Sequence, residues 1–419
     1  MPILTLRFAR QFLNESFTID PDDGASVPFH APAVIYLDNN ASTPLDPDVR
    51  DAMAAAADLY GNPSSVHSVG RQARRAIEEA RDEVARLIGA HTEEIFFTSG
   101  GTEANALAIF GTIARAKGRI VTSEAEHPSV REPAARLAEA GFEWKPVAPE
   151  RSGALDPTKV LESVTSETLL VSVMTANNEY GGIYPVAEIA GELAERGVPI
   201  HTDAVQAAGR VPIDVHAWRV DLLSLSAHKL HGPKGAGALY VRRGFPLEAH
   251  TPGGGQEKKI RGGTENTIGI VGFGVAARLA RERLAVEPDG IARLRDRLEQ
   301  RIVETIPGTR VVGRAAPRLP NTSAILFEKV SGDAVLFRLD LEGVAVSVGS
   351  ACSSGTLAPS PAVLALGFTR REAKGVVRFS LSRLTTDAEI TRVLDLVPRV
   401  VADARAARSP GSVPAATPS

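Results

Sequence analysis

Two residues of this sequence, a lysine and an aspartate, have side chains that could bind and activate a ligand. Each lies where a predicted strand ends. Lys229 closes the segment Ser226-Ala-His-Lys229. A lysine partly desolvated beside histidine and serine can form a Schiff base with a carbonyl group. Asp203 ends the stretch Pro-Ile-His-Thr-Asp, where a carboxylate can either cap the next helix or pair with a protonated ring nitrogen. The pair His228 and His231 is weak support for a metal site, since no carboxylate ligand accompanies it.

A glycine-rich loop with the sequence Ser99-Gly-Gly-Thr-Glu103 joins a predicted strand to a predicted helix. Small residues let backbone N–H groups approach an anion, and the helix N-terminus adds a favourable partial charge. Gly101 and Thr102 are therefore candidate phosphate ligands. The alternative is an ordinary strand-to-helix turn with a hydroxyl cap. No GxxxxGK[ST] motif follows a strand, so a nucleotide P-loop is not supported.

Cys352 is the single cysteine of the chain. One cysteine cannot form an internal disulfide or supply a multi-thiolate metal site, which indicates a reducing compartment and a cytoplasmic protein. A free cysteine is usually a small buried hydrophobe. The surrounding segment Val348-Gly-Ser-Ala-Cys-Ser-Ser-Gly is instead small, polar and glycine-rich, which predicts a mobile loop and a reactive thiol.

The elements that must position these residues alternate between strands and helices. Strands are expected at 34–38, 94–98, 119–122, 169–174, 199–202, 222–226, 238–241 and 323–327, with helices at 71–88, 103–116, from about 129, and at 186–196. This order predicts an α/β fold with a mostly parallel central sheet and helices on both faces. In such a sheet ligands bind beyond the C-terminal ends of the strands, which is where the candidate residues lie.

With 419 residues the chain exceeds the size of one ordinary hydrophobic core. We expect a large domain over residues 48–288, and a smaller α+β domain made of 34–47 and 289–405 that carries the Cys352 loop. Residues 1–33 are predicted to be a disordered extension and not a signal peptide, and 406–419 a disordered tail. A net charge of −3 and the lack of a long apolar run argue against direct nucleic-acid binding and against a membrane span.

Seven motifs resemble, in the same order, those of the cysteine desulfurases, which are class V aminotransferase-like enzymes of the NifS/IscS type with the fold of type I pyridoxal-phosphate enzymes. They are Thr98-Ser-Gly-Gly-Thr-Glu103, Glu126-His127, Ala176-Asn-Asn-Glu-Tyr-Gly181, Thr202-Asp-Ala-Val-Gln206, Ser226-Ala-His-Lys229, Arg261-Gly-Gly-Thr264 and Gly349-Ser-Ala-Cys-Ser-Ser-Gly355. The resemblance runs from about residue 36 to 396. Two departures are the N-terminal extension and Val348, which stands where a small hydroxyl residue is more usual.

The resemblance implies a role for each matching residue. Pyridoxal 5'-phosphate would be bound covalently by Lys229, with Asp203 on its ring nitrogen, His127 stacked on the ring, and Gln206 and Asn178 nearby. Its phosphate would be held by Gly101, Thr102, Ser226 and His228, and by Thr264 from the second subunit of a homodimer. Arg378 would bind the substrate carboxylate through two parallel hydrogen bonds, and Asn178 would also contact the substrate. From the residues alone, Arg378 could equally form a structural ion pair, and His127 could be a capping or core histidine.

The activity implied by the resemblance is removal of sulfur from L-cysteine, leaving L-alanine and a persulfide on Cys352. Lys229, Cys352 and His127 would be the catalytic residues. The sulfur would pass to acceptor proteins for iron–sulfur cluster assembly or tRNA thiolation. The closest alternatives are a selenocysteine lyase, an aminotransferase or an epimerase on the same scaffold, which differ at the nucleophile. A non-catalytic scaffold protein is the more distant alternative.

Overall fold

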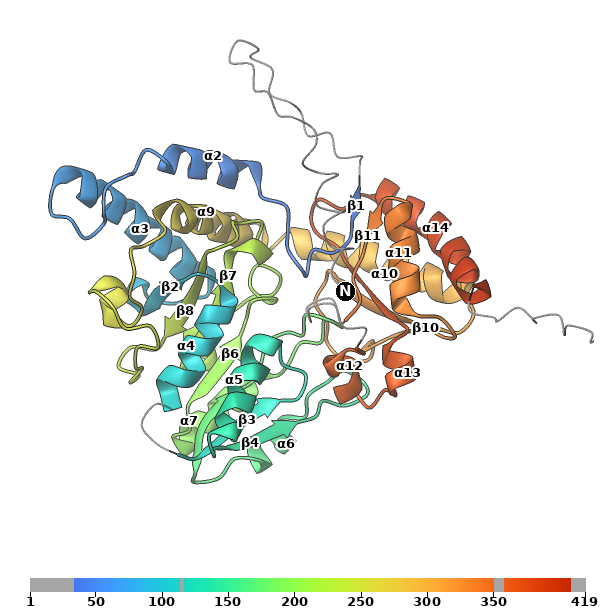
Figure 1. The fold of residues 1–419 in the computed structure, drawn as a ribbon, viewed down its shortest axis with the longest axis horizontal. Helices are drawn as coiled ribbons and strands as arrows, with labels where there is room; N and C mark the ends of the chain where they lie inside the picture. Colours follow the sequence, from blue (N-terminus) through green and yellow to red (C-terminus); the bar gives the residue numbers. More distant parts are fainter. Residues whose placement is uncertain (1–33, 114–116, 350–357, 408–419) are drawn as a thin grey trace, which may run out of the picture. The chain divides into compact units, whose positions relative to one another are not determined.

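The computed structural model describes residues 34–113, 117–349 and 358–407. In this part of the chain a seven-stranded sheet forms the centre, in the order β2-β8-β7-β6-β5-β3-β4 (Figure 1). Its strands are β2 (Ile95–Thr98), β3 (Arg119–Ser123), β4 (Glu143–Val147), β5 (Thr168–Ser172), β6 (Ile200–Asp203), β7 (Leu222–Ser226) and β8 (Gly237–Val241). All neighbours pair in parallel except β8, which runs antiparallel to both β2 and β7. The expected mostly parallel α/β fold is confirmed.

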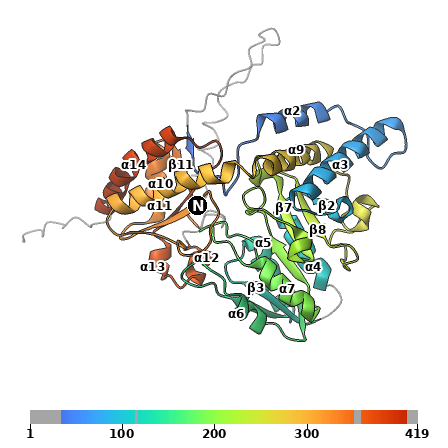
Figure 2. The same cartoon turned by 180° about the vertical axis from the view of Figure 1, so that it is seen from behind.

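Helices cover both faces of this sheet, because successive strand residues point to opposite sides. Phe96 packs in a cluster with α4 (Gly101–Ile113), whereas its neighbours Ile95 and Phe97 pack in the cluster that holds α3 (Ser68–Leu87). The helix α5 (Pro128–Glu139) lies beside α4, as Figure 1 shows, and α7 (Val186–Arg196) is in front of the sheet in Figure 2. Both faces are therefore apolar, which explains the nearly continuous burial of the central strands.

A second set of elements builds a separate apolar cluster. Its strands are β1 (Ile35–Tyr36) paired with β11 (Val344–Ala345), and β12 (Val376–Ser380), β10 (Thr322–Phe327) and β9 (Thr309–Val311) in one antiparallel sheet. The helices α10 (Glu287–Thr305), α11 (Gly332–Leu341) and α14 (Asp387–Ala406) pack on them. The division into a large and a small domain stays a prediction.

The remaining helices are mostly short, except α9 (Thr267–Arg283), which packs in the same apolar cluster as α3. They are α2 (Pro47–Ala56), α6 (Pro157–Glu162), α8 (Val215–Trp218), α9, α12 (Pro361–Ala365), α13 (Arg370–Ala373), and the 3₁₀ turns η1 (Thr92–Glu94), η2 (Ala227–Lys229) and η3 (Gln256–Lys259). No helix among the described residues is long and apolar enough to cross a membrane.

The strands β4, β9, β11 and β12 were not among the expected elements. β4 contains a proline and is largely exposed. It forms only the outer edge of the sheet, where both features are tolerated. The predicted extension 1–33 and nearly all of the predicted tail 406–419 lie outside the described residues.

His201 ties the three central parallel strands together at the level of Asp203. Its Nδ1 lies 2.8 Å from Ser172 Oγ on β5, and its Nε2 lies 2.9 Å from Ser224 Oγ on β7. The ring has no exposed surface, and this burial lowers the pKa of His201 from 6.5 to about 3. The imidazole is therefore neutral in the folded protein at neutral pH.

The pKa of His201 predicts how stability changes in acid. Below pH 6.5 the unfolded chain binds a proton at this residue and the folded chain does not, so folding becomes less favourable as the pH falls toward about 3. Relative to His201→Gln, the parent protein should lose about 1.4 kcal/mol of unfolding free energy per pH unit between pH 6 and 4. Urea unfolding of both proteins at each pH measures this difference. Parallel pH curves would contradict it.

Candidate active site

A cavity of about 300 Å³ opens at the C-terminal ends of the central strands. Ten of the twelve residues predicted for the site line it: Gly101, Thr102, His127, Asn178, Asp203, Gln206, Ser226, His228, Lys229 and Arg378. Asp203 ends β6, Lys229 lies three residues after β7, and Gly101 begins the helix after β2. Because β2, β6 and β7 run in the same direction, their C-terminal ends meet at one edge of the sheet. The topology therefore brings these distant residues together.

Two predicted residues are not among those that line the cavity. Cys352 lies outside the described residues. Thr264 is exposed and does not line the cavity of its own chain. It follows Arg261, whose guanidinium forms two hydrogen bonds, of 2.7 and 3.2 Å, with the carboxylate of Glu103 in the first turn of α4.

A chain of hydrogen bonds links Asp203 to His127. Asn105 Nδ2 donates to Asp203 Oδ2 at 2.7 Å and to Ser129 Oγ at 2.8 Å, and Ser129 Oγ lies 2.7 Å from His127 Nδ1. The other oxygen of Asp203 accepts from the backbone N–H of Val205 at 2.9 Å. A carboxylate has about four acceptor positions, so Asp203 can accept a further bond from a cationic group in the cavity.

His127 has its orientation fixed by capping α5. Its Nδ1 accepts from the backbone N–H of Ser129 at 3.1 Å, which places the proton of the neutral ring on Nε2. Burial lowers the pKa of His127; the charge of Asp203 opposes this shift and that of Lys229 adds to it. The sequence suggested that His127 either caps a helix or belongs to the site. In the structure it caps α5 and also lines the cavity.

The amine of Lys229 is held by the segment that follows β1. Its Nζ donates to the carbonyl oxygens of Asn40 at 2.5 Å and Ala41 at 2.7 Å. The same Asn40 carbonyl accepts from Gln206 Nε2 at 3.0 Å, and Asn40 Nδ2 donates to Asn178 O. Asn40 therefore joins three of the predicted site residues, and no sequence signal marked it.

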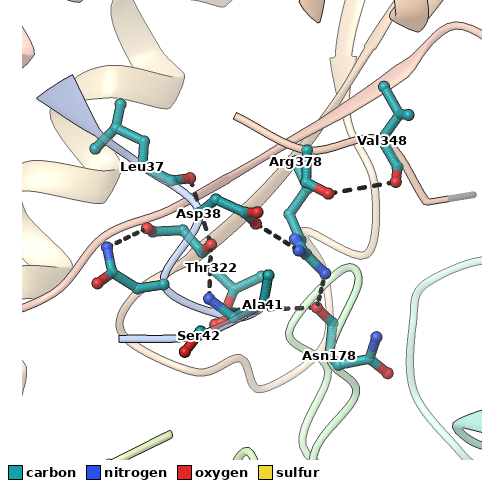
Figure 3. A network of polar contacts seen from close by, with 12 residues as sticks. Leu37, Asp38, Ala41, Ser42, Asn178, Thr322, Val348 and Arg378 are labelled. Atoms are coloured by element: carbon teal, nitrogen blue, oxygen red, sulfur yellow. Dashed lines mark hydrogen bonds and ion pairs between the residues drawn. The ribbon is translucent and has the colours of Figure 1, made fainter. Parts of the chain in front are cut away.

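Arg378 on β12 reaches the cavity from the second group of elements. Its Nη2 donates to Asp38 Oδ1 at 2.7 Å and its Nη1 to the Asn178 carbonyl at 2.9 Å (Figure 3). The Nε–H is buried and has no partner among the described residues. The sequence allowed Arg378 either a structural ion pair or a role in substrate binding. The guanidinium forms an ion pair with Asp38, but it keeps unused donors and lies at the cavity wall.

The start of α4 forms the anion-binding end of the cavity. The thirteen-residue helix begins at Gly101, and a Cβ on this glycine would lie 2.7 Å from Val205 Cγ2. The backbone N–H groups at a helix start attract anions. Burial lowers the pKa of His228 to about 4, so its ring is neutral at neutral pH. It can contribute hydrogen bonds there without adding charge.

Glu126, the residue before His127, is a buried acid without an expected role. Its Oε1 accepts from Ser123 Oγ at 2.5 Å and from the backbone N–H of Met174 at 2.8 Å. Burial raises its pKa to about 8, and the nearby Asp203 adds to the shift. Glu126 is therefore mostly protonated at neutral pH and does not compete with Asp203 as an anion.

The aminotransferase class-V family model matches residues 35–393. A cysteine desulfurase from Nostoc sp. is 44% identical over 377 residues, which are 89% of this chain and 94% of that protein. The cysteine desulfurase NifS of Azotobacter vinelandii is 43% identical over 377 residues, with the same shares of both chains. Among solved structures, a NifS-like protein matches with a TM-score of 0.82 and 34% identity, over 88% of this chain and all of that one.

The chain of bonds between Asp203 and His127 makes Asn105 a test of the site's construction. Asn105→Ala leaves the buried Asp203 Oδ2 and Ser129 Oγ without their donor, so the unfolding free energy should fall by about 1–3 kcal/mol. Denaturant unfolding measures this change. The exposed Asn62, which accepts one bond from Ser64, is the control, and Asn62→Ala should cost less than about 0.5 kcal/mol. Equal losses in both variants would argue against the network.

Proposed function

Because the chain belongs to the class-V aminotransferase family and is a cysteine desulfurase, we propose that its cavity holds pyridoxal 5'-phosphate and L-cysteine and that Cys352 accepts the sulfur. The observation that carries this proposal is the convergence of Lys229, Asp203, His127 and Arg378 on one cavity. A lysine amine, a ring-nitrogen partner, a ring-stacking histidine and a carboxylate-binding arginine are the groups that such a reaction needs.

The residues present fit the cofactor in three ways. Asp203 has acceptor capacity left for a protonated ring nitrogen. The start of α4, with Gly101 and Thr102, and the neutral His228 offer hydrogen-bond donors to a phosphate. Gln206 and Asn178 line the same cavity, where they would contact the ring substituents.

When bound, pyridoxal phosphate stabilises negative charge that develops at the substrate Cα. The amine of Lys229 accepts the Cα proton, since it already lies at the cavity wall. Arg378 binds the substrate carboxylate with the donors that Asp38 and Asn178 leave unused. His127 carries its proton on Nε2 and can donate a hydrogen bond to a group bound in the cavity.

The sulfur transfer itself uses Cys352 as the nucleophile. Its thiolate attacks the substrate sulfur and a sulfur–sulfur bond forms. The carbon–sulfur bond of the substrate breaks, its electron pair stays on the carbon, and a proton converts that carbon into the methyl group of L-alanine. The persulfide then passes its outer sulfur to an acceptor, an iron–sulfur scaffold protein or a tRNA-thiolation relay.

The proposed assembly is a cytoplasmic homodimer in which Thr264 binds the cofactor phosphate of the partner subunit. Its exposure, and its place outside the cavity of its own chain, support this arrangement. The single cysteine supports a reducing compartment.

Replacing the thiol separates cofactor binding from sulfur transfer. Cys352→Ala should keep the absorbance of lysine-bound pyridoxal phosphate but lose alanine and sulfide production from L-cysteine. Ser354→Ala, in the same segment, should keep both. In the parent protein, peptide mass after incubation with L-cysteine should place the additional sulfur on Cys352. Full sulfide production by Cys352→Ala would overturn the assigned nucleophile.

The role of Arg378 predicts a change in KM. Arg378→Lys keeps a positive charge but loses the planar fork, so one or more hydrogen bonds to the carboxylate are lost. At about 1.5–3 kcal/mol for a bond to a charged group, KM for L-cysteine should rise roughly tenfold to a hundredfold, with a smaller change in kcat. Arg399→Lys, at an exposed ion pair with Glu342, is the control. An unchanged KM in Arg378→Lys would contradict the role in substrate binding and leave the ion pair with Asp38 as the role of Arg378.

A further inference from the structure

Three potential metal ligands lie at the edge of the sheet opposite the active-site cavity. His91 directly precedes the turn η1 and Glu94 is its last residue, before β2, and His216 lies in α8 before β7. β2 and β7 begin at this edge, and the active-site residues follow the other ends of the central strands. None of the three residues lines the active-site cavity or has a part in the proposed reaction.

The geometry of these three side chains matches a transition-metal site. Their ligand atoms all lie within 4.8 Å of one another. His216 Nε2 is 3.2 Å from Glu94 Oε2, and the rings of His91 and His216 are 4.9 Å apart between centroids. Ligand bonds of about 2.0–2.1 Å in a tetrahedral zinc site put neighbouring ligand atoms roughly 3.3 Å apart. The His216–Glu94 pair already has this spacing, and the His91 ring is exposed.

The carboxylate at the centre of the group is held in place by the backbone. Glu94 is 2% exposed, its Oε1 accepts from the N–H of Arg243 at 2.9 Å, and its Oε2 accepts from the N–H of His91 at 3.0 Å. Such bonds to a ligating carboxylate orient it and are typical of metal sites. A simple ion pair would need only one histidine beside Glu94. The structure brings two histidines to the same carboxylate, as a metal site requires.

A buried polar group beside the cluster gives a second, independent observation. Tyr240 on β8 pairs with Ile95, the residue after Glu94, and its ring centroid is 6.3 Å from that of His216. Its hydroxyl is buried and has no hydrogen-bond partner among the described residues. A hydroxyl of this kind needs a partner, and a small shift of the side chain toward a metal-bound water would supply one.

A second cavity borders one histidine of the cluster. His216 and Tyr240 both line a cavity of about 660 Å³, which contains none of the residues assigned to the active site. A metal ion can therefore approach His216 from this cavity.

We propose that His91, Glu94 and His216 bind one zinc ion, with a water molecule as the fourth ligand. Two imidazoles and a carboxylate form a donor set that zinc prefers. The ion joins the turn before β2 to α8, and its role is structural, since it lies at the opposite edge of the sheet from Lys229. This inference is independent of the proposed function.

Zinc binding to the full chain loaded with pyridoxal phosphate tests the proposal. The background is Cys352→Ala, which removes the single thiol as a competing zinc ligand. Zinc chloride is titrated against a chromophoric chelator to give stoichiometry and affinity. His91→Ala and His216→Ala are compared with His250→Ala, a control at an exposed histidine stacked on Phe110 outside the cluster.

The background protein should bind one zinc per chain. Each of the two cluster variants should lose this zinc or bind it at least about tenfold more weakly, because loss of a direct ligand exceeds the effect of a lost supporting bond. A variant that combines His91→Ala and His216→Ala should bind zinc no more tightly than either single variant, and His250→Ala should bind as the background protein does. Zinc should raise the melting temperature of the background protein but not of the double variant. Unchanged zinc binding in both single variants, or no zinc binding by the background protein, would overturn the proposal.

Discussion

The hydrogen bonds of the buried residue Asn40 are the interactions on which the site depends. Its backbone carbonyl accepts from Lys229 and Gln206, and its side chain donates to the Asn178 carbonyl and to Thr322 Oγ1. Asn40 is only 2% exposed, so each of its polar groups needs a partner. The segment after β1 therefore has one favourable position, in which it contacts the central sheet elements and β10 together. Lys229 is oriented by this segment even before a carbonyl ligand engages its amine.

The electrostatics of the cavity follow from burial as much as from sequence. Burial keeps the rings of His127 and His228 neutral, through lowered pKa values. Among the described residues, the ionic side chains at the wall are then Lys229, Arg378 and Asp203, and Asp38 pairs with Arg378 from behind the wall. The positive end of α4 and the donors that Arg378 keeps beside this ion pair suit ligands that carry a phosphate and a carboxylate. A site of this kind would bind anionic groups without an added metal ion.

The cavity residues of the central sheet could be predicted because their motifs follow strands, and parallel strands put their C-terminal ends at one edge. The sequence could not identify Asp38, Asn40 or Asn105 as members of the site. Amides and carboxylates are common in loops and first turns, and their partners here are up to hundreds of positions away in the chain. Which of them closes a buried network is decided by packing. The exposed, proline-containing β4 was missed for a related reason: its pairing with β3 is fixed by the sheet and not by its own residues.

The histidines illustrate the same limit at the opposite edge of the sheet. In the sequence, His228 and His231 attract attention because they are close neighbours, but the fold directs them to different partners: His228 lines the active-site cavity, and His231 Nδ1 lies 2.9 Å from the Pro44 carbonyl. His91 and His216 are separated by more than a hundred residues and share one carboxylate. Spacing along the chain brings ligands together only when one helix or turn carries them all. Where two elements each supply a ligand, the sheet that orders those elements creates the site, and the pairing of β2 with β8 and of β8 with β7 is what carries the two histidines to the same edge.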